Sequence, residues 1–141
     1  SYSITKKEEC LRVAKESLDF LSEICIINEK LFPIGQNGWY NRGDKRVFFD
    51  QQPVDASGFV QAYLEAYAIT QDQTHYNNTV ISFNWFLGNN HLGQMIYDDA
   101  TGGCFDGLGQ HSLNFNQGAE STVCYLLARL SLEDFKTNKK I

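Results

Sequence analysis

Two long connections rich in aromatic residues separate the helical stretches of this chain, and they constrain its fold more than any other feature. They cover residues 28–52 and 88–117, about 25 and 30 residues. Loops longer than roughly 12–15 residues are uncommon in compact domains, where they are usually functional or disordered. Large apolar side chains argue against disorder, and here these are Phe32, Trp39, Tyr40, Phe48, Phe49, Met95, Tyr97 and Phe105. We therefore expect both connections to be ordered.

Apolar residues recur every three or four positions in four stretches, which is the spacing of an amphipathic helix. The predicted helices cover 6–27, 53–70, 73–87 and 118–131, with a further helical turn over 132–135. Pro53 falls at the first position of the second helix, where its missing N–H costs nothing. The stripe predicted to face the core from the last helix consists of Ala119, Val123, Leu126, Leu127 and Leu130. The pattern predicts an all-α fold.

The connections also predict how the helices are arranged. The tight turn at Gln71–Asp72 should join the second and third helices into an antiparallel hairpin. Each long connection leads into a helix, through FDQQPVDAS (49–57) and NFNQGAEST (114–122). We expect these two helix entrances to gather at one end of the bundle. Strand should be limited to short β-ribbons within the loops, for instance around Arg42–Lys45 and Ala100–Gly103.

Composition excludes several classes of function. The 141 residues fit one domain, and an apolar content of 43% is enough for a core. The net charge is −5 and the few basic residues are mostly scattered, which argues against a nucleic-acid partner. No apolar run approaches the roughly 20 residues that span a bilayer. The four cysteines are not spaced C-x-x-C, and we expect buried free thiols rather than disulfides, which indicates a reducing, cytoplasmic location.

Metal and cofactor sites are not expected. The histidines and cysteines have no zinc-ligand spacing, and no Gly-rich phosphate loop is present. The segment IYDDATGGCFDGLGQ (96–110) has carboxylates that could hold Ca²⁺, but turn chemistry accounts for most of its Asp and Gly content.

Amides and carboxylates cluster at both predicted helix entrances. Helix N-termini carry free N–H groups and positive potential, which favour carboxylates and acceptor oxygens. Capping of each helix by its own residues is the alternative explanation. Two similar entrances fed by aromatic loops favour a shared polar site instead. Its expected members are Asp50, Gln51, Gln52, Asn116, Gln117 and Glu120.

One further acid and three loop aromatics complete the candidate set. Asp106 lies between Phe105 and Gly107, where burial is expected to raise its pKa. Asp, Asn, Gln and Glu supply the paired donors and acceptors that neighbouring sugar hydroxyls require. Aromatic rings present flat faces to the C–H side of a sugar. The loop aromatics expected to do so are Trp39, Tyr40 and Tyr97, and Trp85, within the third predicted helix, is a further candidate.

Four sequence blocks carry a family resemblance: FDQQPVDAS (49–57), WFLGNN (85–90), YDDATGGCFDGL (97–108) and NQGAEST (116–122). They resemble the helical segment at the C-terminal end of some bacterial group 1 glycosyltransferases and related proteins of the six-hairpin (α/α) toroid type. The resemblance runs over roughly residues 38–132. It implies antiparallel helical hairpins that form an arc of an (α/α) toroid, with a carbohydrate site where the long loops meet.

The resemblance also implies a larger protein. A closed ring of six hairpins needs about twelve helices of 11–12 residues each, more than this chain can hold. Residues 1–141 are therefore expected to form a single helical domain, the C-terminal piece of a protein whose nucleotide-sugar-dependent domain lies upstream. An open arc leaves an apolar flank uncovered, so the isolated piece is a candidate homodimer.

Three functions remain open from the sequence. The first is a carbohydrate-recognising domain attached to a glycosyltransferase and acting in glycan or polysaccharide synthesis, with no catalysis by this segment alone. Its substrate-binding residues would be Trp39, Tyr40, Asp50, Gln51, Gln52, Tyr97, Asp106, Asn116, Gln117 and Glu120. The second is a glycoside hydrolase-like unit with paired catalytic carboxylates among Asp50, Asp106 and Glu120. The third is a non-catalytic helical protein-interaction module.

Overall fold

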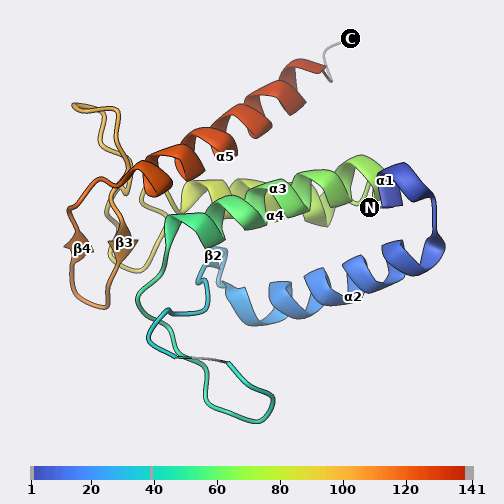
Figure 1. Ribbon diagram of the computed structural model, residues 1–141, viewed down its shortest axis with the longest axis horizontal. Helices are drawn as coiled ribbons and strands as arrows, with labels where there is room; N and C mark the ends of the chain where they lie inside the picture. Colours follow the sequence, from blue (N-terminus) through green and yellow to red (C-terminus); the bar gives the residue numbers. More distant parts are fainter. Residues whose placement is uncertain (1, 39, 139–141) are drawn as a thin grey trace.

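A computed structural model of the protein describes residues 2–38 and 40–138, and within them it is mostly helical (Figure 1). The helices of this described part are α1 (Tyr2–Thr5), α2 (Glu8–Cys25), α3 (Pro53–Thr70), α4 (Gln73–Asn84) and α5 (Ala119–Asn138). Two antiparallel strand pairs accompany them: β1 (Ile26–Ile27) with β2 (Lys30–Leu31), and β3 (Gly107–Leu108) with β4 (Leu113–Asn114). The prediction of an all-α fold with short ribbons is confirmed.

The α3–α4 hairpin forms the centre of the molecule. Pro53 occupies the first turn of α3, which spans the predicted residues, and Gln71 ends the helix in the left-handed conformation at φ 56°. Asp72 then caps α4, because its side chain accepts the backbone N–H of Thr74 at 2.9 Å. The hairpin is antiparallel, as predicted from the short turn, and α5 runs along it (Figure 1).

The hydrophobic core lies where α3, α5 and the two long connections meet. Val60 and Leu64 of α3 pack there with Tyr125 and Leu132 of α5. The connections add buried side chains of their own, namely Leu31, Ile96, Cys104, Leu108 and Leu113. Both connections therefore contribute buried residues to the core, although Phe48 and Met95 are exposed. All four cysteines are free thiols, and all but Cys10 are buried.

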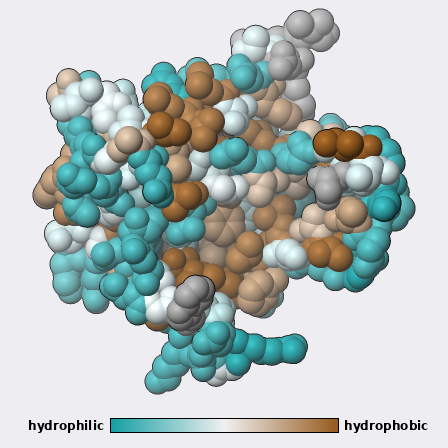
Figure 2. Space-filling view, in the orientation of Figure 1, coloured by the Kyte–Doolittle hydropathy of each residue, from teal (hydrophilic) through white to brown (hydrophobic). Residues whose placement is uncertain are grey.

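The face of α5 that packs against α3 differs from the predicted one. Buried residues of α5 are Ser121, Cys124, Tyr125, Ala128 and Leu132. The predicted core stripe is exposed: Ala119 faces solvent, and Val123, Leu126, Leu127 and Leu130 are 52%, 44%, 47% and 53% exposed. Figure 2 shows the resulting hydrophobic patch over α5. Since α5 is apolar on two faces, its periodicity could not identify the buried one.

Helix ends and ribbon positions also differ in detail. The third helix ends at Asn84 rather than 87, because the Asn90 side chain donates to the Trp85 carbonyl at 3.0 Å and holds the following turn. The turn predicted over 132–135 is part of a continuous α5. Ribbons form at 26–31 and 107–114, whereas 42–45 and 100–103 are turns.

The two helix entrances meet at one end of the bundle, as predicted. Gln51 and Leu108 exchange two backbone hydrogen bonds, with N···O distances of 3.0 and 2.9 Å. This bridge joins the segment before α3 to the strand pair before α5. In Figure 1 the β3–β4 ribbon and the start of α5 lie together at the left of the molecule.

Helix α2 lies beside the hairpin and is attached mainly through its C-terminal part. Leu18 and Cys25 are its buried residues, and its Ser22 hydroxyl lies 2.7 Å from the Tyr63 hydroxyl of α3. The guanidinium of Arg46, from the first long connection, donates to the carbonyls of Ile24 and Phe32. Within the described residues, no helix combines the length and hydrophobicity required to cross a bilayer.

The two faces of α5 give a direct test of this packing. Leu132→Ala should lower the free energy of unfolding by about 2–5 kcal/mol, because Leu132 is 5% exposed and its removal leaves a cavity. Leu130→Ala, two residues away and 53% exposed, should change it by no more than about 0.5 kcal/mol. Urea denaturation of both variants measures the difference. The opposite order would mean that the sequence pattern had identified the buried face correctly.

Candidate functional site

The carboxylate of Asp106 holds the entrance of α5. One of its oxygens accepts the backbone N–H of Gly118 at 2.7 Å and the Ser121 hydroxyl at 2.6 Å. Its other oxygen accepts a hydrogen bond from the side-chain amide of Asn116. The backbone N–H of Asp106 in turn donates to the Asn116 carbonyl at 2.8 Å. Asp106 therefore caps a helix that begins 13 residues later in the chain.

The pKa of Asp106 is lowered, not raised as the sequence suggested. The hydrogen bond from Ser121 is the main cause, and those from Asn116 and Gly118 add to it. They outweigh the effect of burial, which acts in the opposite direction. Asp106 is therefore ionised at neutral pH, and both of its oxygens already accept hydrogen bonds. It is unsuited to serve as a general acid.

A second network ties the loop turn at 98–103 to the same helix entrance. Asp98 accepts the backbone N–H of Ala100 at 3.0 Å and the side-chain amide of Gln117 at 2.9 Å. The hydroxyl of Thr101 lies within hydrogen-bond distance of both Asp98, at 3.0 Å, and Gln117, at 2.8 Å. These bonds lower the pKa of Asp98, with the Ala100 backbone contributing most. The turn is thereby fixed against the residue that precedes α5.

Two glycines allow this close packing. A Cβ atom on Gly103 would lie 2.3 Å from Oε1 of Gln117, and one on Gly118 would lie 2.7 Å from Oδ1 of Asp106. The segments TGGCFDGL (101–108) and NQGAEST (116–122) are thus interlocked through their glycines and polar side chains. The backbone N–H of Cys104 adds a further bond to the Thr122 hydroxyl, at 3.2 Å.

The entrance of α3 is built around a buried amide. Gln51 is fully buried; its side-chain oxygen accepts from the indole N–H of Trp85 at 2.9 Å, and its nitrogen donates to the Phe48 carbonyl at 3.2 Å. Gln52 lies against Gly107, where a Cβ would meet its Nε2 at 3.1 Å. Gln51 therefore supports the junction of the two loops and cannot touch a ligand at the surface.

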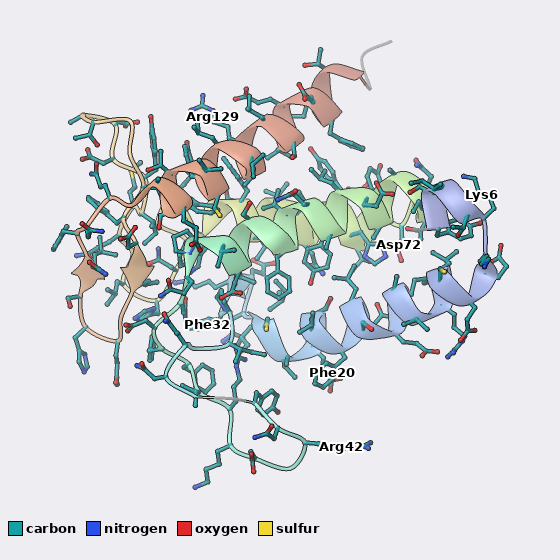
Figure 3. All side chains as sticks on the ribbon, viewed as in Figure 1. Lys6, Phe20, Phe32, Arg42, Asp72 and Arg129 are labelled. Atoms are coloured by element: carbon teal, nitrogen blue, oxygen red, sulfur yellow. The ribbon has the colours of Figure 1, made fainter. Side chains whose placement is uncertain are left out.

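A cleft of about 360 Å³ opens between α5 and the segment that follows α4. Phe83, Tyr97 and Tyr125 supply its aromatic side chains. Its charged side chains come from Asp99 on the loop and from Arg129, Glu133 and Lys136 on α5. Figure 3 shows Arg129 on the outer side of α5. This cleft combines flat aromatic surface with hydrogen-bonding groups of both charges.

Contacts within the cleft fix its aromatic rings. Tyr97 stacks on Tyr125 with ring centroids 4.3 Å apart and planes 17° from parallel. Arg129 donates to Glu133 at 2.9 Å and to the Tyr125 hydroxyl at 3.4 Å. Burial raises the pKa of Tyr125, and Asp99 adds a smaller effect in the same direction, which Arg129 opposes. Tyr125 is therefore a neutral donor and acceptor at pH 7.

The helix entrance and the cleft are connected through Asp98. Its chain neighbours Tyr97 and Asp99 both line the cleft, and Asp98 itself is held by Gln117. The network before α5 therefore positions one wall of the cleft. The residues that the sequence singled out at this entrance act mainly as the framework of the site.

The structure brings together only part of the predicted set. Asp106, Asn116 and Gln117 form the framework before α5, and Tyr97 lines the cleft. Asp50 and Glu120 are exposed at the same end of the bundle. Tyr40 lies beside Phe20 and Arg42, which Figure 3 places on the opposite side of the molecule from Arg129. Trp39 lies outside the described residues. Trp85 is fully buried and therefore offers no surface to a ligand.

Of the residues that line the cleft, the predicted site set contains only Tyr97; Tyr125 and all four charged residues were missed. Tyr125 and Arg129 are four residues apart on α5, so a signal was present in their helical spacing. The predicted apolar stripe lies on a different face of the helix, so it gave no indication of this pair.

Within the described ranges, no group of three or more His, Cys, Asp or Glu side chains is arranged to hold a metal ion. No protein-family model and no curated protein matches the sequence.

Gly118→Ala should disrupt the α5 entrance. The added methyl group would meet a carboxylate that three hydrogen bonds hold in place, so we expect a loss of about 1–3 kcal/mol in the free energy of unfolding. Gly58→Ala is the matched control, because a Cβ there meets nothing within 4 Å. This substitution replaces a glycine in a helix interior and should raise the free energy of unfolding by up to about 1 kcal/mol. Chemical denaturation measures both. A neutral Gly118→Ala variant would contradict the interlocked arrangement.

The lowered pKa of Asp106 predicts a pH dependence of stability. Its contribution is complete above the unfolded-state pKa of roughly 3.9 and is lost as pH falls through the lower folded-state value. Asp106→Asn removes this titration and places an amide N–H₂ opposite that of Asn116. The variant should be less stable than wild type at pH 7, and its thermal midpoint should fall less steeply between about pH 5 and pH 2. Parallel midpoint curves for the two proteins would refute the assignment.

Proposed function

We propose that this chain is a carbohydrate-recognising helical domain attached to a glycosyltransferase, acting in glycan or polysaccharide synthesis. The observation that carries the proposal is the cleft beside α5, where the stacked pair Tyr97–Tyr125 is bordered by Asp99 and Arg129. Its volume of about 360 Å³ lies within the range of small-molecule sites, roughly 300–1,000 Å³.

The chemistry of the cleft suits a sugar ring. An aromatic floor can receive the C–H face of a pyranose. Carboxylate oxygens at the rim accept from sugar hydroxyls, and the guanidinium of Arg129 donates to their oxygens. Asp99 is exposed, so it is available to a ligand. The rim carries two carboxylates and two cations, a balance that suits an uncharged saccharide.

The resemblance implies a larger protein. Two of its blocks, YDDATGGCFDGL (97–108) and NQGAEST (116–122), contain the interlocked glycines and the Asp106 cap, which gives those blocks a physical reason to occur together. In this proposal the helices form an arc of an (α/α) toroid, and the nucleotide-sugar-dependent domain lies upstream in the same cytoplasmic protein. Transfer chemistry belongs to that upstream domain.

Hydrolysis by this segment is the less favoured alternative. Both carboxylate oxygens of Asp106 already accept hydrogen bonds at the start of α5, and its lowered pKa opposes a general-acid role. Glu133 is held by Arg129. Asp50 and Glu120 remain as exposed carboxylates, and an exposed pair does not exclude water from a reacting bond.

A protein-interaction module is supported by a separate observation. The exposed residues Val123, Leu126, Leu127 and Leu130 form an apolar face on α5, of the kind that marks contact surfaces. Such a face is compatible with carbohydrate binding in the cleft, and it would also serve a homodimer of the isolated piece.

Binding is tested by NMR titration of the chain with neutral mono- and oligosaccharides. We expect a dissociation constant on the order of a millimolar, about −4 kcal/mol. Asp99→Asn should weaken binding about tenfold, because a charged acceptor is lost. Asp134→Asn, an exposed acid of α5 that does not line the cleft, is the matched control and should bind like wild type.

Two results would redirect the proposal. Binding lost in Glu120→Gln but kept in Asp99→Asn would move the site to the helix entrance. Hydrolysis of activated aryl glycosides that disappears in Glu120→Gln would favour the hydrolase alternative. If no saccharide shifts any resonance at ten millimolar or so, well above the expected constant, the interaction module becomes the better explanation.

A further inference from the structure

A long groove runs between α2 and α3, separate from the carbohydrate cleft. It consists of three adjoining cavities of about 280, 330 and 590 Å³. The first and second share Leu18, Leu21 and Ala62 as lining residues. The second and third share further residues, among them Leu11 and Ile69. Because each cavity shares walls with the next, the three form one elongated channel along α3.

The middle of the groove is apolar. Leu11, Leu18 and Leu21 of α2 face Ala62 and Ala66 of α3 there, so small side chains on one wall oppose large ones on the other. Glu65 is the one acid among the residues lining this middle cavity. The groove persists because α2 approaches α3 mainly at Leu18, Ser22 and Cys25, where it is buried or hydrogen-bonded.

The two ends of the groove differ in charge. The end near α1 is lined by Lys6 and Lys15, with no carboxylate among its lining residues. Lys6 lies at the α1–α2 junction (Figure 3), and its ammonium group is 5.6 Å from the centre of the Tyr2 ring. The opposite end is lined by the acid Asp55. An anionic group would therefore be favoured at the α1 end and disfavoured at the other.

We propose that this groove binds a single-chain anionic amphiphile, a free fatty acid, with its chain between α2 and α3 and its carboxylate beside Lys6 and Lys15. The apolar middle matches a hydrocarbon chain, and the two lysines match the head group. Asp72 interacts electrostatically with Lys15, and its side chain accepts the backbone N–H of Thr74 at the start of α4.

The Ser22 and Tyr63 hydroxyls, 2.7 Å apart, tie α2 to α3. A single hydrocarbon chain can enter the groove without breaking that contact. The proposal does not depend on carbohydrate binding, because none of the groove residues lines the cleft beside α5.

Matched ligands test the two parts of the proposal. Dodecanoate, added below its micellar concentration, should bind and should perturb the NMR resonances of α2 and α3. Octanoate should bind more weakly, with up to about a fourfold loss per methylene removed. Dodecanol, which has the same chain without the charge, should bind more weakly than dodecanoate.

Matched variants locate the site. Ala62→Leu fills the groove and should abolish dodecanoate binding, whereas Ala119→Leu, at an exposed alanine of α5, should not. Lys6→Gln and Lys15→Gln should each weaken dodecanoate binding about twofold to fivefold and leave dodecanol binding unchanged. Lys45→Gln, an exposed lysine of the first long connection, is the control for net charge.

Several outcomes would overturn the proposal. Equal affinity for dodecanoate and dodecanol would remove the head-group site. Binding that survives Ala62→Leu, with circular dichroism showing an intact fold, would place the ligand elsewhere. Absence of binding by any of the three ligands would refute the proposal outright. A dimer in sedimentation experiments that Ala62→Leu dissociates would identify a second copy of the chain as the occupant instead.

Discussion

The bond between the Asp106 carboxylate and the first turn of α5 is the interaction on which the rest of the structure depends. Asp106 directly precedes β3, so this bond joins β3 to the start of α5. Leu108 of β3 also pairs with Gln51, which lies just before α3. Three segments distant in sequence are therefore fixed relative to one another by a few polar contacts at one end of the bundle. The free N–H groups of a helix N-terminus make such an anchor possible, because they need acceptors that the helix itself cannot supply.

The sequence predicted those features that depend on local order. Pro53 and the short turn at Gln71 define the α3–α4 hairpin, because proline and a left-handed residue act on their own neighbours. The buried face of α5 could not be predicted in this way. Its apolar residues occupy two faces, and only the position of α3 decides which is covered. The prediction of a raised pKa for Asp106 was wrong for a related reason. Its apolar neighbours in the sequence suggested burial, whereas the groups that lower its pKa, Gly118 and Ser121, lie 12 and 15 residues away.

The candidate site, too, could be predicted only in part from the sequence. Amides near the helix entrances were identified from composition, but most of them serve the framework. Gln51 holds Trp85, and Gln117 holds Asp98. The groups that line the cleft come from a loop and from a helix face, and only the tertiary fold brings them together. Tyr97 and Tyr125 are 28 positions apart and nevertheless stack at 4.3 Å. A single sequence holds no signal for such a pair beyond the presence of two aromatic residues.

The one-sided attachment of α2 has a consequence for how the molecule opens. Its C-terminal part is held by the Ser22–Tyr63 bond and by Arg46, which donates to the Ile24 carbonyl. Between Glu8 and Ser17, in contrast, α2 has no buried residue. Segments with few buried contacts open locally at a lower free energy than the core does. We therefore expect the N-terminal half of α2 to exchange its amide hydrogens through local opening while α3 and the buried face of α5 remain closed.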